Sequence, residues 1–374
     1  MNGNIRIGNL FGIPFYVNPS WFLVLGLFTW SYSSGITAQF PALNSGVPLL
    51  LGLVTSLLLF ASVLAHELGH SFVALRQGIG VQSITLFLFG GLASLDQESK
   101  TPGEAFWVAI AGPVVSLLLF GLLSLMTLAT GAATPLTAIL SLLASVNLAL
   151  ALFNLIPGLP LDGGNILKAL VWKVTGNPYK GVAFASRVGQ IFGWVAIASG
   201  LLPLVISGSL GSVWNLLIGV FLLQNAGRAG QSAKIQEQFI GLTAADAVAL
   251  NSPVVSAQLS LREFADQQIL SRDNWRKFLV TNAEGQLVGE IAIDALQTRS
   301  VEQWVDTQVQ DLMKPIEPSL TVASGQPLLE VAKLLEEKQL PALTVVRDNG
   351  VLVGILEKAS IRDLIQRRTQ ATPA

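Results

Sequence analysis

The pattern of apolar and polar positions divides the chain into a long apolar part and a shorter mixed part. Up to about residue 228, apolar runs are separated by short polar segments, and formal charges are sparse. Beyond Arg228, acids and bases are frequent and interspersed with apolar positions. The pattern predicts a membrane domain over residues 1–228, a linker over 229–244, a soluble domain over 245–368 and a tail over 369–374.

Six apolar runs approach the length of about 20 residues that a helix needs to cross a bilayer. The predicted fold class is therefore a polytopic α-helical membrane protein with about six transmembrane helices, followed by a soluble α+β domain. The predicted spans are Trp21–Ile36, Val47–Leu75, Ala105–Leu128, Pro135–Leu155, Val188–Ile206 and Val213–Ala226.

Composition agrees with this division and narrows the classes of function. The chain is 51% hydrophobic with a mean hydropathy of +0.59, and its 12% of charged residues is about half the share usual in soluble domains. A net charge of −1 gives no indication of nucleic-acid binding. Because the chain has no cysteine, disulfides and thiolate metal ligands are excluded. No cleavable signal peptide is predicted.

The charges between the predicted spans orient the chain in the membrane. With six spans, the basic residues fall on one side, whereas the opposite loops at 37–46, 131–134 and 207–212 carry no charge. Positive residues favour the cytoplasmic side. We therefore expect a multi-pass protein of the cell membrane with both termini and the soluble domain in the cytoplasm. The basic residues are Arg6, Arg76, Lys100, Lys168, Lys173, Lys180, Arg187, Arg228 and Lys234.

Two breaks in the apolar pattern contain residues that interrupt helices. Residues 81–95 include Phe89-Gly90-Gly91 and partly alternate in polarity, which predicts a short membrane-associated β-hairpin, with an ordinary loop as the alternative. The second break, over 154–164, holds two prolines, three glycines and Asp162. Irregular backbone at membrane depth must be buried in protein or line a water-filled space.

Both histidines of the chain lie in one motif of five residues, His66-Glu67-Leu68-Gly69-His70. On a helix, positions i and i+4 share a face, so the two imidazoles can bind one metal ion. Glu67 can then reach a water on that metal and act as a general base. The alternative, two histidines in a helix core, would bury two imidazoles and a carboxylate at a high cost.

A catalytic zinc ion commonly takes three protein ligands and keeps a fourth position for water. The chain offers no third histidine and no cysteine, and the acids at 96, 98 and 104 lie in a polar loop that we expect to be solvated. Asp162, on the second break, is the predicted third ligand. Its alternative role is to cap a helix over Gly163–Thr175.

This constellation predicts hydrolysis of a peptide bond. Zinc lowers the pKa of bound water to about 7, and Glu67 would take the proton as hydroxide attacks a polarised carbonyl. The same carboxyl group can pass the proton to the leaving amine. The amide of Asn154 could bond the substrate backbone or the developing oxyanion. A helix–helix hydrogen bond is the alternative for Asn154, and more so for Asn147.

Together these motifs resemble the site-2 protease family of intramembrane zinc metalloproteases. The resemblance covers most of residues 1–228 and rests on the H-E-x-x-H motif and on the N-x-x-P-x-x-P-L-D-G-G motif at 154–164. It is also supported by Ala111-Gly112-Pro113 at the opening of a span, by Pro19-Ser20-Trp21 before the first span, and by Phe89-Gly90-Gly91.

The resemblance implies roles for individual residues. Zinc would be bound by His66, His70 and Asp162, with Glu67 as the catalytic acid and base. The residues that shape the active site and help to hold the substrate would be Asn154, Pro157 and Pro160.

The resemblance also implies the class of substrate. This would be another protein in the lipid bilayer, cut in or near its transmembrane segment, such as an anti-sigma factor or a membrane-tethered regulator. A helical substrate must unwind to expose its scissile carbonyl. The hairpin that contains Phe89, Gly90 and Gly91 could take up the unwound segment as an added edge strand.

Two similar stretches follow one another in the soluble part, over Leu242–Thr298 and Val309–Arg368. Each has an opening helical segment, a short strand, an amphipathic helix and two strands joined by a turn, so that Phe278–Gly289 matches Leu343–Gly354. This internal repeat of about 60 residues resembles a tandem CBS (cystathionine-β-synthase) domain, or Bateman module.

The resemblance implies a ligand, because CBS pairs often bind an adenine nucleotide in the cleft between repeats. The usual Thr/Ser-x-x-Asp positions read Ala292 and Ala295 in the first repeat and Glu357 and Ser360 in the second. Both pairs depart from the signature, although Ser360-Ile361-Arg362-Asp363 is a shifted near-match. The alternative is a module without ligand that docks or forms a homodimer.

The predicted function is regulated intramembrane proteolysis by a zinc metalloprotease with a regulatory CBS pair. One alternative is a catalytically inactive membrane scaffold or CBS sensor. Another is a CBS-gated transporter, which would spread charged or polar residues along several spans. Here the intramembrane ionisable residues reduce to the two histidines, Glu67 and Asp162, which indicates a metal site rather than a conduction path.

Overall fold

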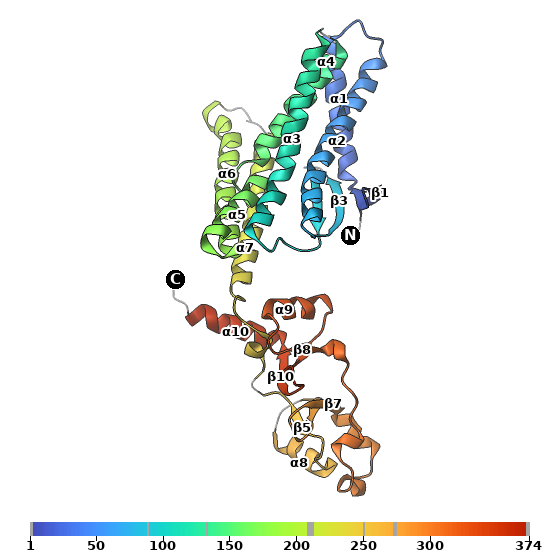
Figure 1. Cartoon of the computed structure of the whole chain (residues 1–374), viewed down its shortest axis with the longest axis vertical. Helices are drawn as coiled ribbons and strands as arrows, with labels where there is room; N and C mark the ends of the chain where they lie inside the picture. The colour runs from blue at the N-terminus through green and yellow to red at the C-terminus, as the bar shows by residue number, and fades with distance from the viewer. Residues whose placement is uncertain are drawn as a thin grey trace. The chain divides into compact units, whose positions relative to one another are not determined.

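The computed structural model describes residues 3–87, 90–131, 134–207, 213–249, 251–271 and 275–371. The chain folds as two compact units, Met1–Lys234 and Ile235–Ala374 (Figure 1). The N-terminal unit is mostly helical, and the C-terminal unit combines small sheets with helices.

The helices of the N-terminal unit are α1 (Ser20–Gln39), α2 (Val47–Arg76), α3 (Pro102–Thr130), α4 (Pro135–Asn154), α5 (Asp162–Thr175), α6 (Pro178–Ser207) and α7 (Val213–Glu237). Within the described residues, four helices are long and apolar enough to cross a membrane: α2, α3, α4 and the Pro178–Pro203 part of α6. α1 and α7 form where the first and sixth spans are predicted but are not among these four. Serine and threonine residues in α1 and the polar second half of α7 reduce their hydropathy.

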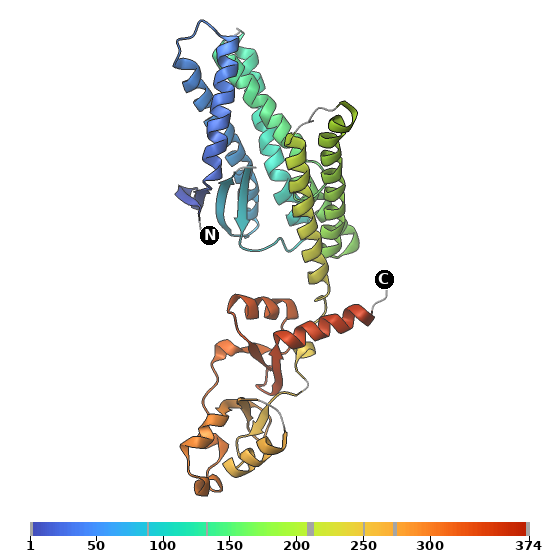
Figure 2. The same cartoon turned by 180° about the vertical axis from the view of Figure 1, so that it is seen from behind.

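The predicted hairpin is present and belongs to a larger sheet. β3 (Val81–Phe87) pairs antiparallel with β4 (Gly90–Leu95), so this segment is not an ordinary loop. Two strands that were not expected from the sequence, β1 (Ile5–Leu10) and β2 (Ile13–Val17), extend the sheet in the order β1-β2-β3-β4. β2 runs parallel to β3, and β4 packs on α2 (Figure 2). Phe89 lies outside the described residues.

The long helices pack closely at glycines, and one side-chain amide forms a hydrogen bond between two of them. A Cβ added at Gly52 of α2 would lie only 2.6 Å from the carbonyl oxygen of Thr29 in α1. A Cβ added at Gly193 of α6 would lie 3.1 Å from the carbonyl oxygen of Gly219 in α7. Buried Asn147 of α4 donates to Ser62 Oγ of α2 over 3.1 Å, which is the predicted helix–helix alternative for this side chain.

The C-terminal unit contains two copies of a strand–helix–strand–strand pattern. In both sheets, the central strand pairs in parallel with the first strand and antiparallel with the last. The first copy is β5 (Val254–Ser256), α8 (Leu261–Ser271), β6 (Lys277–Thr281) and β7 (Leu287–Ala292). The second is β8 (Thr321–Ala323), α9 (Leu328–Glu337), β9 (Ala342–Val346) and β10 (Leu352–Glu357), followed by α10 (Lys358–Ala371). Short 3-10 helices are η1 (Ala244–Ala247), η2 (Ile293–Thr298), η3 (Val301–Trp304), η4 (Val309–Asp311) and η5 (Pro318–Leu320).

The two repeats exchange their opening segments. η1 precedes the first sheet in the chain, yet its Ala244 is buried in the hydrophobic core of the second repeat beside Leu328. η4 precedes the second sheet, and its Val309 is buried in the core of the first repeat with Phe264 and Val280. Each repeat therefore completes its core with residues of the other.

Reciprocal backbone hydrogen bonds accompany this exchange. Leu328 N–H donates to Leu242 O over 3.0 Å, and Leu261 N–H donates to Thr307 O over 2.9 Å. At the hairpin turns, Leu287 N–H donates to Gly350 O, and Leu352 N–H donates to Gly285 O, both over 3.0 Å. Equivalent positions thus bond to each other in both directions, as a pseudo-two-fold axis between the repeats requires.

Val309→Ala tests the exchange. Val309 is 0% exposed, so removing its two methyl groups should lower the free energy of unfolding of the C-terminal unit by about 1–3 kcal/mol. Hydrogen exchange followed by mass spectrometry should show lost protection in β6 of the first repeat, although the substitution lies in the second. Val305→Ala, at a position 66% exposed, is the control. Unchanged protection of β6 would contradict the exchange.

Candidate metal centre

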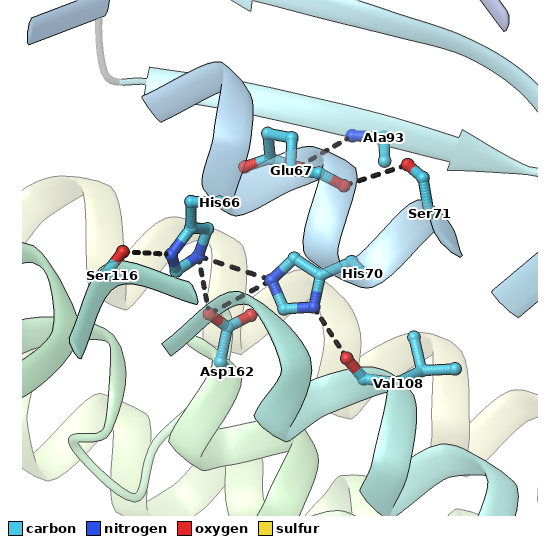
Figure 3. Close-up of polar contacts among 8 residues, drawn as sticks. All are labelled: His66, Glu67, His70, Ser71, Ala93, Val108, Ser116 and Asp162. Carbon is cyan, nitrogen blue, oxygen red and sulfur yellow. Dashed lines mark hydrogen bonds and ion pairs between the residues drawn. The ribbon is translucent and has the colours of Figure 1, made fainter. Parts of the chain in front are cut away.

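The two histidine side chains of the H-E-x-x-H motif meet Asp162 inside the N-terminal unit (Figure 3). α2 places His66 and His70 one helical turn apart on one buried face. His66 Nε2 lies 3.0 Å from Asp162 Oδ2, and His70 Nε2 lies 3.3 Å from the same oxygen. The two Nε2 atoms are themselves 3.3 Å apart. Residues separated by more than 90 positions thus form one compact cluster of possible ligand atoms.

The other nitrogen of each imidazole has a partner on α3. His70 Nδ1 lies 2.6 Å from the carbonyl oxygen of Val108, which can only accept, so Nδ1 carries the proton. His66 Nδ1 lies 2.9 Å from Ser116 Oγ, which can accept the same kind of bond. A proton on Nδ1 leaves Nε2 as a lone-pair acceptor in a neutral ring. Such bonds orient histidines that ligate metals.

The three facing atoms fit a metal ion. With Nδ1 protonated, both Nε2 atoms and the Asp162 carboxylate present lone pairs to one another at 3.0–3.3 Å. Acceptors at this distance repel unless a proton or a cation lies among them. Two imidazoles and a carboxylate are a common ligand set of catalytic zinc, and ligands about 2.0–2.1 Å from a tetrahedral ion are about 3.3 Å apart. The chemistry and spacing of the donors therefore suit zinc.

Gly112 of α3 makes room for the imidazole nitrogens. A Cβ at this position would lie 2.6 Å from His66 Nε2 and would also collide with His70 Nε2. Ala111-Gly112-Pro113 does not open the span, as predicted from the sequence, because α3 begins at Pro102 with a capping box of Thr101 and Glu104. The motif therefore lies inside α3, one turn from Ser116.

Glu67 lies between the metal cluster and the sheet. The backbone N–H of Ala93 in β4 donates to Glu67 Oε2 over 3.2 Å. A Cβ at Gly91 would collide with Cγ of Glu67 and lie 3.1 Å from its Oε1. β4 thus approaches the carboxyl group closely because position 91 has no side chain, and it holds one oxygen while the other remains available.

Asp162 opens α5 but does not cap it. The N-cap position is Leu161, whose side chain has no oxygen, so the helix-cap alternative for Asp162 is not what the structure contains. A carboxylate in the first turn of a helix is favoured by the helix dipole. The first turn of α5 faces α2, because Asp162 contacts both His66 and His70 (Figure 3).

A cavity of 590 Å³ opens beside these side chains. Of the residues predicted to shape the active site, those in its lining are Asn154, Pro160, Gly90 and Gly91. Pro157 is exposed and outside the described lining, and Phe89 is outside the described residues. Asn154 is the last residue of α4, at the edge of the irregular segment.

Several residues of the site were not predicted from the sequence. Ser116 orients one imidazole, the carbonyl of Val108 orients the other, and the amide of Ala93 holds Glu67. Two of these three contacts use backbone atoms, which every residue type has, so the sequence does not indicate them. Ser116, a buried polar residue four positions after Gly112 in an apolar helix, is the one signal that could have been read.

Comparison with known proteins places this site in a family. The model for peptidase family M50 matches residues 54–133 and 120–196, and the CBS domain model matches residues 309–367. A protein of Synechocystis sp. named as a zinc metalloprotease, sll0528, is 55% identical over 98% of this chain and 96% of its own length. The zinc metalloprotease Rip3 of Mycobacterium tuberculosis, also so named, is 34% identical over 100% of this chain and 95% of its own.

Among solved structures, the site-2 protease from Methanocaldococcus jannaschii matches 61% of this chain and 95% of its own, with a TM-score of 0.44 and 28% identity. The identity to full-length relatives and the family match over the helices that carry His66, Glu67 and His70 agree with each other. The chain therefore belongs to peptidase family M50, the site-2 protease family, and is a membrane-embedded zinc metalloprotease with a C-terminal CBS module.

Proposed function

We propose that His66, His70 and Asp162 hold the zinc ion and that Glu67 is the catalytic acid and base of an intramembrane endopeptidase. The observation that carries the proposal is the convergence of three acceptor atoms at 3.0–3.3 Å beside the Glu67 carboxyl group. When bound, zinc supplies an activated water and polarises the scissile carbonyl.

Residues of the chain itself transfer the proton and bind the substrate. Glu67 accepts the proton of the attacking water and donates it to the leaving nitrogen, so one group serves both halves of the reaction. The Ala93 amide holds Glu67 Oε2 and leaves Oε1 to exchange the proton. Asn154 in the cavity lining offers an amide to the substrate backbone or to the oxyanion.

Glu67→Gln tests the catalytic assignment. The amide keeps the shape of the side chain but cannot accept the proton, so cleavage of a single-span substrate should fall by about 10²–10⁴-fold. Zinc should stay at about one ion per chain, since Glu67 is not a proposed ligand. Glu104→Gln is the matched control, because glutamine can also complete the capping box of α3. A Glu67→Gln variant as active as the wild type would refute the assignment. If the wild type were inactive as well, the scaffold alternative would be favoured.

Gly112→Ala tests the ligand geometry from the opposite helix. Alanine favours helix over glycine, so α3 itself should not suffer. The added methyl group would nevertheless enter the space of both Nε2 atoms, and zinc affinity should fall by about 10–100-fold, as for other supporting positions. Titration against a chelator measures this. Gly121→Ala in the same helix, with no atom within 4 Å of its added Cβ, should bind zinc like the wild type. Equal affinity in both variants would contradict the proposed site.

β4 is the proposed receiving edge for an unwound substrate. In the described residues it pairs with β3 on one side, and the Ala93 N–H on its other side points to Glu67. A substrate strand added there would run past the catalytic carboxyl group, with Gly90 and Gly91 at its start.

Strand addition predicts a period of two in the substrate. Bonded and non-bonded residues alternate along a strand, so N-methylation of successive substrate amides should slow cleavage at every second position. The unmodified peptide and the weakly affected positions serve as internal controls. A uniform effect along the segment would exclude strand addition at β4.

The family supports a class of substrate, and the basic residues support an orientation in the membrane. We propose a membrane-tethered regulator or anti-sigma factor as substrate, and a chain in the cell membrane with both termini in the cytoplasm, since the basic residues gather on one side of the predicted spans. The chain has no cysteine, so labelling of single cysteines introduced near each end tests the orientation directly.

We propose that residues 245–368 form a regulatory CBS pair joined to the membrane domain by residues 229–244. The two alternatives for its action are an adenine nucleotide between the repeats and a homodimer contact. The Ser360 hydroxyl bonds to the backbone of Glu357 at the start of α10, where it serves the helix rather than an open cleft. Binding of a labelled adenine nucleotide to the full chain, with its mass in solution, separates the two.

A further inference from the structure

A second cavity, of 250 Å³, lies between α6 and α7, away from the metal centre. Arg187 and Gln190 of α6 and Gln231 and Lys234 of α7 contribute polar side chains to its lining. The long side chains at 187, 231 and 234 are exposed, so their polar ends can reach a ligand that enters from outside. The metal centre shares none of these residues.

The cavity is open because α7 carries glycine where it faces α6. A Cβ added at Gly230 would lie 2.6 Å from Ser186 Oγ, and one added at Gly227 would lie 3.5 Å from Gln190 Nε2. The Ser186 hydroxyl donates to the carbonyl oxygen of Ala226 and joins the two helices on its floor. The walls are therefore held in place without filling the space.

The described lining of this cavity contains two basic side chains, Arg187 and Lys234, and no aspartate or glutamate. The nearest acid along α7 is Glu237, three residues after Lys234 and outside the lining. Lys168 is compensated by Glu98 at 3.2 Å, but within the described part of the chain neither Arg187 nor Lys234 forms an ion pair. Two uncompensated cations and two amides at one concave site favour an anion with several acceptor oxygens.

The cavity lies where both helices change from apolar to polar. Arg187 directly precedes a stretch of α6 that has no charge, and Arg228 and Lys234 follow the uncharged stretch of α7. Such a position corresponds to the level of lipid headgroups, where basic pockets between membrane helices bind phosphate.

We propose that this cavity, which we call the α6–α7 site, binds a phosphate group, carried by an anionic phospholipid or by a free phosphate compound. Arg187 and Lys234 neutralise the charge from the two helices, and Gln190 and Gln231 donate further hydrogen bonds. The bound group would join α6 to α7 as Ser186 does. The proposal is independent of the assignments at the metal centre.

Thermal unfolding of the full chain in micelles tests the site. The probes are dihexanoyl phosphatidylglycerol, dihexanoyl phosphatidylcholine with the same chains, and inorganic phosphate. The anionic lipid should raise the melting temperature in a saturable way. In Arg187→Gln/Lys234→Gln, its apparent Kd should rise about tenfold or more, since each basic residue near the surface contributes to phosphate binding.

Lys173→Gln/Lys180→Gln is the matched control, because it removes the same charge at exposed positions outside the cavity lining. It should bind the lipid like the wild type, and Arg187→Lys/Lys234→Arg, which keeps both charges, should restore most of the affinity. Binding of phosphatidylglycerol alone identifies a lipid headgroup, whereas competition by inorganic phosphate extends the site to free phosphate compounds. Equal losses in both glutamine pairs, equal binding of phosphatidylcholine, or no binding by the wild type would overturn the proposal.

Discussion

The N-terminal unit depends on one electrostatic constraint, the confinement of three lone-pair acceptors face to face. The lone pairs of His66, His70 and Asp162 repel one another in this arrangement unless a proton or a cation lies among them, and the surrounding elements hold the three side chains in place. α3 orients both rings through their Nδ1 atoms, and the lack of a side chain at Gly112 leaves room for their Nε2 atoms. The unwound segment after α4 delivers the carboxylate. Three separate parts of the chain thus serve a cluster a few ångströms wide.

The ligand cluster could be predicted because ionisable residues are so sparse in the apolar part of the chain. With two histidines and few acids, His66, Glu67, His70 and Asp162 were almost the only candidates. The supports of the site could not be predicted in the same way. The Val108 carbonyl and the Ala93 amide are backbone groups, and their partners are decided by how α3 and β4 pack on α2. The zinc ligands themselves stay a prediction that metal binding must test.

The fold follows the same division between local and long-range information. The long apolar helices and the β3–β4 hairpin are local patterns and were predicted, apart from the lower hydropathy of α1 and α7. β1 and β2 were not, because β2 pairs in parallel with a strand more than 60 residues later, a partner that no local pattern indicates. The repeat in the C-terminal unit was visible as similar sequence. Its exchanged segments were not, because either core offers an equivalent place to either opening segment.

That exchange sets the order in which the C-terminal unit can form during synthesis. The core of the first repeat lacks Val309 until the ribosome has added the start of the second repeat. η1 can pack only later, after α9, β9 and β10 of the second repeat have been synthesised. Neither repeat can become a finished domain while the other is missing. During synthesis the first repeat therefore stays incomplete behind the membrane domain, and the C-terminal unit forms as a whole only after both repeats have been made.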